Sequence, residues 1–362
     1  MPDLPPLARA AHAAHCLRCL QALPDSQIEV DASRMALAFY CIGTLDLLCL
    51  LQEKTRETDR EAWREWIWEQ QTSGRYGSGF RPSPFMTPAL RAPEDPYTDY
   101  DTPHIIMTYT ALLTLAILRD DFSRLDRPGL LDFIRACQRD DGSFCTVPGS
   151  NETDLRSLYC AFAISHMLDD WSAVNTSRAI AFIASCRSYE GGYGQAPFCE
   201  AQGGTTYIAI ASLHLVPHVQ APLLTAAERE LTIQWLVRNQ HPAGGFSGRT
   251  GKDADACYCF WCGAALQILG AGDLVDARAL AMFLANCQFK YGGLAKAPGE
   301  HPDPYHTYLS LAALSMYMPA SALASDQRHA ASWTFEPLDP LLNARVETAR
   351  WARKYIPAPP RG

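Results

Sequence analysis

A short glycine-rich stretch of the chain combines residue types that could hold a phosphate and a metal ion side by side. Arg249 and Lys252 offer two cations that suit an oligophosphate. Asp255 and Cys257 follow within a few residues, and His306 comes one structural repeat later. A carboxylate, a thiolate and an imidazole make a plausible three-ligand zinc set with one open position, which is typical of catalytic rather than structural zinc. The pattern predicts an oligophosphate holder beside an open metal site.

The composition indicates a large buried core and argues against two kinds of partner. The chain has 362 residues, of which 48% are hydrophobic and 19% are charged, and its formal net charge is -8. This negative balance argues against general nucleic-acid binding, which needs a basic face. The apolar stretch from Leu45 to Leu51 is far too short to span a bilayer, so we expect no stable membrane insertion.

The N-terminus and the cysteines predict a cytoplasmic protein. Residues 1–6 lack the basic-then-apolar layout of a signal peptide. The 13 cysteines fall mostly inside helical patterns, which predicts reduced thiols. Two Cys-x-x-Cys pairs, Cys16 with Cys19 and Cys259 with Cys262, each lack a second pair of the same kind. We interpret them as buried helical cysteines.

A helical repeat must position the candidate residues. A face with positions i, i+3, i+4 and i+7 occurs five times, and its last four copies recur at intervals of about 50 residues. A turn that contains glycine follows each copy, and a more apolar helix comes next. Glycine suits a helix exit at which the backbone needs a positive φ. The copies of the face begin at Trp63, Leu130, Ala179, Thr232 and Leu280.

The helices are expected to alternate between two kinds. The amphipathic helices are predicted near residues 7–21, 61–70, 129–138, 177–187, 226–239 and 274–287. The nearly all-apolar helices are predicted near residues 33–51, 104–118, 156–168, 204–215, 256–269 and 305–316. A helix that is apolar all round must be buried, while one with a single apolar stripe lies outside. The pattern predicts an all-α fold of six helical hairpins that could close into an α/α barrel.

We expect a single α/α-barrel domain over residues 1–355. Its repeats lie roughly at residues 61–118, 129–168, 177–215, 226–269 and 274–316. The proline-rich insertion between Phe80 and Thr102 is predicted to be a long loop. A proline-containing C-terminal tail over residues 333–362 is expected to wrap around the surface.

The chain resembles the β subunits of the protein prenyltransferases, and most of all those of type I geranylgeranyltransferases. The resemblance extends from about Ser33 to Met318. Its matching segments are residues 33–36, 104–110, 141–144, 202–206, 248–258, 292–296 and 303–306. It implies an α/α-barrel β subunit that pairs with a helical-repeat α subunit in the cytoplasm.

The resemblance also implies roles for individual residues. Asp255, Cys257 and His306 match the zinc ligands of the family, which implies one zinc ion per β subunit. The residues expected to bind the diphosphate of geranylgeranyl diphosphate are Gln202, Gly203, Gly204, Arg249, Lys252 and Tyr258. Gln202 stands where the family usually carries a His, and a glutamine donates a hydrogen bond but carries no charge.

Two positions distinguish members of the family. Lys296 stands where farnesyltransferases carry an Asp that helps to hold magnesium. The lysine ammonium is therefore expected to act in catalysis in place of that metal, and magnesium is not expected to be required. Ala36 stands where farnesyltransferases place a bulky Trp. A small side chain there is expected to leave room in the lipid pocket for one more isoprene unit.

Three residues are expected to contact the protein substrate through its C-terminal CaaX peptide: His104, Arg156 and Ser157. Arg156 matches an Arg near the end of the peptide, where a cation helps to hold a carboxylate. A plain surface salt bridge is the alternative for Arg156. Ser157 and Ile106 differ from the resembled enzyme, so the preferred last side chain of the peptide stays open.

The resemblance therefore implies a thioether-forming enzyme. It would transfer a geranylgeranyl group to the cysteine of CaaX proteins such as Rho-type small GTPases, with X often Leu. A farnesyltransferase β subunit is the first alternative, disfavoured by Ala36 and Lys296, and a Rab geranylgeranyltransferase is less similar. A terpene cyclase and a non-catalytic helical scaffold are alternatives from other classes. A cyclase needs an Asp-x-Asp-Asp motif, of which Asp253 to Ala256 supplies only half.

Overall fold

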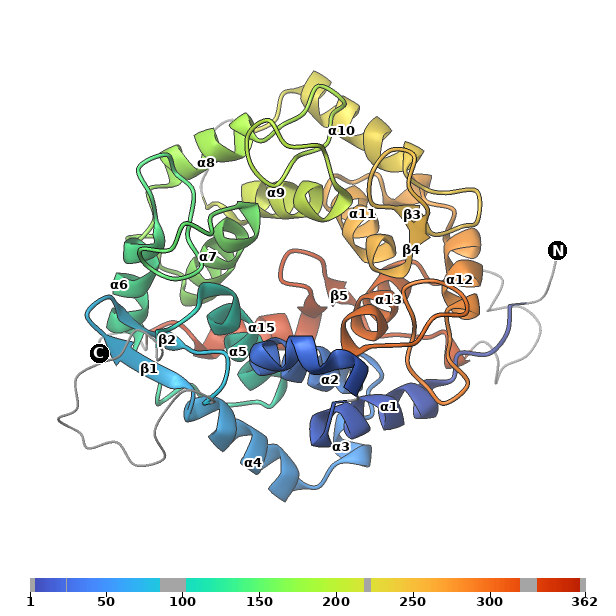
Figure 1. Ribbon diagram of the computed structural model, residues 1–362, viewed down its shortest axis with the longest axis horizontal. Coiled ribbons are helices and arrows are strands. Elements are labelled where there is room, and N and C mark those ends of the chain that lie inside the picture. The colour runs from blue at the N-terminus through green and yellow to red at the C-terminus, as the bar shows by residue number, and fades with distance from the viewer. Residues whose placement is uncertain (1–3, 24, 85–101, 218–222, 320–330, 359–362) are drawn as a thin grey trace. The chain divides into compact units, whose positions relative to one another are not determined.

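Helices make up most of the computed structural model, which describes residues 4–23, 25–84, 102–217, 223–319 and 331–358 (Figure 1). Contacts divide the chain into two interleaved units. Unit 1 comprises Met1–Leu23, Tyr40–Lys54 and Ala184–Val346, and unit 2 comprises Pro24–Phe39, Thr55–Ile183 and Glu347–Gly362. Most of the expected loop between Phe80 and Thr102 and the last residues of the expected tail lie outside the described residues.

Unit 1 contains a row of buried helices covered by amphipathic ones. In the row, α11 (Ala256–Ile268) packs against both α9 (Gly203–Leu215) and α13 (Pro304–Met316). Two helices with one buried stripe each, α10 (Ala226–Arg238) and α12 (Ala277–Asn286), lie on one side of this row (Figure 1). The expected alternation of apolar and amphipathic helices is confirmed here. The other elements of the unit are α1 (Arg9–Gln21), α3 (Leu51–Lys54), the 3-10 helix η3 (Gly272–Leu274), and the paired strands β3 (Phe246–Ser247) with β4 (Ala254–Asp255) and β5 (Leu338–Asp339) with β6 (Ala344–Arg345).

Unit 2 repeats the same plan. Its buried helices α5 (Ile105–Ile117) and α7 (Leu155–Leu168) pack against each other. Its other elements are the 3-10 helix η1 (Asp25–Ser33), α4 (Glu57–Trp68), β1 (Gln71–Gly74), β2 (Gly77–Phe80), α6 (Arg127–Cys137), most of α8 (Thr176–Ser185) and α15 (Val346–Tyr355). The helix α2 (Arg34–Leu47) begins in unit 2 and continues in unit 1.

Glycine turns connect the two helices of a hairpin, as the sequence predicts. Gly244 has a φ of 102°, and a Cβ on it would lie 2.1 Å from the carbonyl oxygen of Ala279 on α12. Gly142 has a φ of 91° and would meet the carbonyl oxygen of Arg178 on α8 at 2.2 Å. Only a residue without a side chain allows each turn to lie this close to the first helix of the following hairpin.

Polar residues at the starts of the buried helices tie these helices to the preceding turns. On α9, Thr206 Oγ1 accepts a hydrogen bond from Tyr193 N, and on α13, Thr307 Oγ1 accepts one from Leu294 N, both at 2.9 Å. An Asp carboxylate caps the N-terminus of α7, α11 and α13 in turn, and each accepts from a backbone N–H of its own first turn. The repeat thus places an acidic side chain at the same point of these three buried helices, whereas α9 carries Gln202 there.

The segment expected to be a surface tail contains β5, β6 and α15. Leu342 and Ala349 are fully buried in it. The prolines of this segment flank α15 and do not interrupt it, which is why a proline count misses the helix. No helix within the described ranges is both long and apolar enough to cross a membrane.

Candidate metal centre and phosphate site

The three expected metal ligands meet at the N-termini of two neighbouring helices of unit 1. Asp255 caps α11, Cys257 lies in the first turn of α11, and His306 lies in the first turn of α13. Because α11 packs against α13, one donor atom from each residue lies within 4.8 Å of the other two. The structure therefore brings together the carboxylate, thiol and imidazole that the sequence predicts.

Two carboxylates determine the protonation of this group. Asp303 Oδ2 lies 2.6 Å from His306 Nδ1, and Asp255 Oδ1 lies 3.4 Å from His306 Nε2. Burial lowers the pKa of His306, but hydrogen bonds to Asp255, Asp303 and Cys257 outweigh it and raise the pKa to about 11. Burial also raises the pKa of Cys257 to about 12. The surroundings of His306 therefore favour a positive charge at this position.

The donor group fits a zinc ion. Carboxylate oxygen, thiolate sulfur and imidazole nitrogen are all zinc ligands, and three protein ligands leave one position for a substrate. Asp303 fixes Nδ1 of His306, so Nε2 is the nitrogen that faces Asp255. A carboxylate behind a ligating histidine is a common outer partner in zinc sites.

The expected diphosphate residues are assembled around Tyr258. Gly203 N donates to Gly248 O at 2.8 Å, which joins the start of α9 to the loop between β3 and β4. The ring of Tyr258 occupies the space where a Cβ on Gly248 would lie, at 2.2 Å, and it would meet a Cβ on Gly203 at 3.0 Å. The close approach of Tyr258 therefore requires a glycine at 248, whereas at Gly203 the nearest obstacle is Cys262 Sγ, at 2.6 Å. The charge of Arg249 also acts on the Tyr258 hydroxyl.

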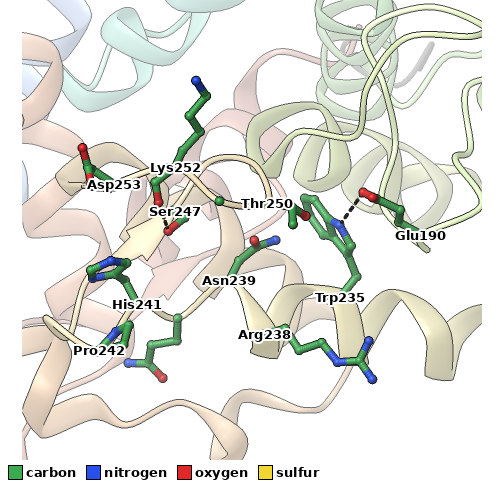
Figure 2. Close-up of a pocket in the computed structure, with 12 residues that line it drawn as sticks. Glu190, Trp235, Arg238, Asn239, His241, Pro242, Ser247, Thr250, Lys252 and Asp253 are labelled. Atoms are coloured by element: carbon green, nitrogen blue, oxygen red, sulfur yellow. Dashed lines mark hydrogen bonds between the residues drawn. The ribbon is translucent and has the colours of Figure 1, made fainter.

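The two loop cations have different surroundings. Arg249 Nη1 forms an ion pair with Glu200 at 3.0 Å, and both side chains are about half exposed. Lys252 is exposed and lines a pocket of about 510 Å³ beneath the loop (Figure 2). Its amino group points away from the Trp235 and His241 side chains of this pocket (Figure 2). The pocket therefore adjoins the loop without containing the metal donors.

Gln202, Gly204 and Lys296 border the same region. Gln202 is the N-terminal cap residue of α9, directly before Gly203, and Gly204 follows in the first turn. The carbonyl oxygen of Lys296 accepts a hydrogen bond from Ala256 N at 2.8 Å, at the start of α11. Lys296 therefore lies beside Asp255, and its side chain is exposed.

The expected peptide and lipid residues lie in unit 2. Arg156 forms ion pairs with Asp154 at 2.7 Å and with Glu152 at 3.4 Å. Burial and the charge of Arg156 lower the pKa of His104 to about 4. His104 Nδ1 and Ser157 Oγ are buried and have no hydrogen-bond partner among the described residues. Ala36 is half-buried in the first turn of α2.

Sequence reasoning missed two residues of the site. It assigned no role to Asp303, although an Asp three residues before a candidate ligand at a helix start is a recognisable signal. It also missed Glu200, the partner of Arg249. The 49-residue separation of that pair gives no local signal.

The fold and the site together define a class of protein. Such a protein is built of helical hairpins and carries a cluster of three metal donors beside a cationic loop. Residues 7–344 match the family described as "Prenyltransferase alpha-alpha toroid domain". The chain belongs to this family, and the expected α/α-barrel fold class is confirmed.

Relatives of known name agree with this assignment. The chain is 43% identical over 219 residues to the geranylgeranyl transferase type-1 subunit beta of Arabidopsis thaliana, a match that spans 59% of this chain and 58% of that protein. It is 39% identical over 312 residues to the protein of the same name from Dictyostelium discoideum, spanning 81% and 86%. The expected resemblance and the prenyltransferase enzyme class are confirmed.

A solved structure shares the fold. Candida albicans protein geranylgeranyltransferase-I complexed with GGPP superposes with a TM-score of 0.84 at 24% identity, over 98% of this chain and 100% of that chain. At this level of identity the likeness supports the fold alone.

Proposed function

We propose that the chain is the catalytic β subunit of a zinc-dependent protein geranylgeranyltransferase of type I, which acts with an α subunit in the cytoplasm. The observation that carries the proposal is the Asp255, Cys257 and His306 donor cluster, next to the loop that bears Arg249. The names of the relatives support the same activity.

The reaction joins a protein thiol to a lipid. The sulfur of the substrate cysteine forms a bond to the first carbon of geranylgeranyl diphosphate, while the bond from that carbon to oxygen breaks. The diphosphate leaves with the electron pair, and the thiol proton passes to solvent. Zinc held by Asp255, Cys257 and His306 supplies a Lewis acid that lowers the pKa of a coordinated thiol.

The cations of this chain stabilise the leaving diphosphate. Arg249, Lys252 and Lys296 would neutralise the charge that develops on its oxygens, which is electrostatic stabilisation of the transition state. Tyr258 and Gln202 add neutral hydrogen-bond donors. The diphosphate would replace Glu200 at Arg249, because both offer oxygen anions to the same guanidinium. Three cations make added magnesium unnecessary in this proposal.

Unit 2 offers polar groups for the peptide. The unsatisfied His104 Nδ1 and Ser157 Oγ would gain partners from a bound CaaX segment, which offsets the cost of leaving them buried. Arg156 would share its charge between Asp154 and the peptide carboxylate.

Competition between two lipids tests the proposal. The chain is coexpressed with a prenyltransferase α subunit and offered a CaaX peptide ending in Leu, with equal farnesyl and geranylgeranyl diphosphate and no magnesium. We expect mainly the geranylgeranyl product. Ala36→Trp should shift the ratio roughly tenfold towards farnesyl, because overlap with a bulky ring costs roughly 1–3 kcal/mol.

Controls separate pocket length from general damage. Ala36→Ser is nearly the size of the native residue and should keep the wild-type ratio. Lys296→Asp should keep the lipid preference but create a need for magnesium, since it removes one positive charge and adds a negative one. A wild-type enzyme that prefers farnesyl, or that is inactive without magnesium, would return the farnesyltransferase alternative to first place.

A further inference from the structure

A carboxylate already occupies one of the cations proposed to hold the diphosphate. Arg249 Nη1 lies 3.0 Å from Oε2 of Glu200, and the two side chains are 44% and 57% exposed. Lys252 and Lys296 are also exposed, but neither forms an ion pair with another described residue. In the described part of the chain, Arg249 is thus the one of the three proposed cations whose charge is balanced before a diphosphate binds.

The loop that bears Glu200 is closed at its base. Gln202 N donates a hydrogen bond to Tyr193 O at 3.0 Å. Within the loop, a Cβ on Gly194 would lie 2.4 Å from the carbonyl oxygen of Cys199, so the two sides of the loop are pressed together. The backbone of Glu200 is therefore held next to Gln202, whereas more than half of its side chain is exposed and is free to turn towards solvent.

The loop that bears Arg249 is fixed to the same place. Gly203 N donates to the carbonyl oxygen of Gly248, the residue before Arg249, at 2.8 Å. The segment of Gln202 and Gly203 therefore joins the two loops that carry the ion pair. A tether of this kind keeps a carboxylate at a high effective concentration beside its partner. Glu200 can release Arg249 to a stronger anion, but it stays beside the site.

The ion pair is weak enough to be exchanged. Exposed pairs of a guanidinium and a carboxylate contribute little to stability, because both groups remain hydrated. A diphosphate carries more negative charge than one carboxylate and offers several oxygens to the guanidinium of Arg249, so it displaces Glu200 when it binds. The displaced carboxylate then lies near an anion, and the two like charges repel each other.

We propose that Glu200 is an internal competitor of the diphosphate, which weakens the binding of diphosphate to Arg249 and speeds its release after the lipid has been transferred. The inference rests on the proposed function, because it takes the diphosphate to be the ligand of Arg249. Glu200 turns away as the lipid diphosphate binds and returns as the inorganic diphosphate leaves. It makes and breaks no covalent bond and acts through Arg249, so it is a positioning residue.

An internal competitor suits a site in which several cations hold one leaving group. The cations that stabilise the departing diphosphate in the transition state also bind it as a product. Release of a product limits the turnover of many enzymes. A carboxylate that replaces the product at Arg249 leaves the guanidinium paired, and the cation is then less attractive to the diphosphate that has just left.

Binding of inorganic diphosphate tests the competition. The zinc-loaded enzyme with its α subunit is titrated with inorganic diphosphate in a calorimeter, without magnesium. Glu200→Gln keeps the size of the side chain but removes its charge, and it should tighten diphosphate binding about two- to fivefold, the range that an exposed ion pair allows. Glu190→Gln is the matched control and should leave the affinity nearly unchanged. Glu190 lines the pocket beneath the same loop but accepts a hydrogen bond from Trp235.

A double-mutant cycle shows whether the effect passes through Arg249. Arg249→Gln should weaken diphosphate binding, and adding Glu200→Gln to it should give no tightening. In a Lys252→Gln background, by contrast, Glu200→Gln should tighten binding by the same factor as in the wild type. Stopped-flow displacement should show that diphosphate dissociates more slowly from Glu200→Gln than from the wild type, by about two- to fivefold as well.

The possible results separate the inference from the proposed function. Unchanged or weaker binding in Glu200→Gln would overturn the competition. Equal tightening with and without Arg249 would overturn it too, because plain repulsion between like charges would then explain the effect. Tighter binding with an unchanged dissociation rate would overturn the role in release. A wild-type enzyme that binds no diphosphate would contradict the proposed function of the cationic site itself, which the lipid competition above tests separately.

Discussion

The two thiol and imidazole clusters of unit 1 are built from similar residues but hold their protons differently. In the metal-donor cluster, two carboxylates contact the imidazole of His306. In the thiol cluster of α1, formed by His15 and Cys19, Cys19 Sγ lies 3.8 Å from His15 Nε2. The first cluster raises the pKa of its thiol, Cys257, and the second lowers the pKa of Cys19.

The difference shows that burial, together with the groups next to the sulfur, decides what a cysteine can do. Where carboxylates surround an imidazole, a positive charge is required, and either a proton or a metal ion can supply it. Where a half-buried thiol lies beside an imidazole, as Cys19 does, the thiol loses its proton more readily. The same residue types therefore favour metal binding in one place and a free, more acidic thiol in the other.

The largest expected effect comes from removing the thiol of the metal-donor cluster. Cys257→Ala should lower zinc affinity by more than about a hundredfold, beyond the range of outer-partner substitutions. Activity should be lost with it, while the helical circular dichroism persists because the buried helices pack without the metal. Cys259→Ala, two residues further along α11 and outside the donor group, should keep its zinc. Wild-type zinc content in Cys257→Ala would remove this residue from the site.

A smaller loss of zinc affinity is expected from replacing Asp303, whose carboxylate contacts Nδ1 of His306. Asp303→Asn keeps a side-chain oxygen for the backbone N–H of His306 but removes the charge at Nδ1. Zinc affinity should fall about 10- to 100-fold, measured by competition with a chelator. Asp154→Asn, at the corresponding cap of α7, is the matched control and should leave zinc affinity unchanged. Equal losses in both variants would show that helix capping, not the contact with His306, causes the effect.

Acid should weaken the packing of α1, because its buried His12 contacts a backbone N–H and an amide oxygen rather than a carboxylate. His12 Nδ1 accepts from Gly293 N at 2.9 Å, and Nε2 lies 3.0 Å from Gln288 Oε1. Burial lowers the pKa of His12 from 6.5 to about 4. The folded state thus favours the neutral ring, so this stability is present above pH 6.5 and is lost as the pH falls towards 4.

The size of this loss can be measured against a variant that does not titrate. Near pH 5 the contribution of His12 to the free energy of unfolding should have fallen by about 2 kcal/mol. The loss amounts to about 1.4 kcal/mol for each pH unit below the pKa of the unfolded state. His12→Asn keeps an acceptor for Gly293 N and should show a flatter decline in unfolding free energy with acid. Parallel curves for the two proteins would contradict the assignment to His12.

The smallest expected effect tests the electrostatics of the thiol cluster. The charge of Arg18 contributes to the lowered pKa of Cys19. Arg18→Gln should raise the midpoint of the pH profile for Cys19 alkylation by about a few tenths of a unit, because an exposed charge acts through water. Peptide mass spectrometry reports the alkylation of Cys19 separately from the other cysteines. A midpoint that moves downwards would be inconsistent with the stated role of Arg18.

The sequence determined the helices and the composition of the metal-donor cluster. The helical periodicity, the glycine turns and the cap residues act over a few neighbours, so their effects can be predicted locally. Asp255 and Cys257 lie in one helical turn, and the repeat places His306 at the same level of the next buried helix. The helix α15 was missed, since most of its stability comes from packing of residues such as Ala349.

Only the tertiary structure decided which groups contact one another across the repeat. The partners of Arg249 and of His12 come from distant positions along the chain, and no local pattern specifies them. Protonation depends on such contacts because burial and neighbouring charges, not residue type, set the pKa of a buried group. The sequence therefore supplied the thiols and imidazoles, and the packing of the helices decided which of them come together as metal donors.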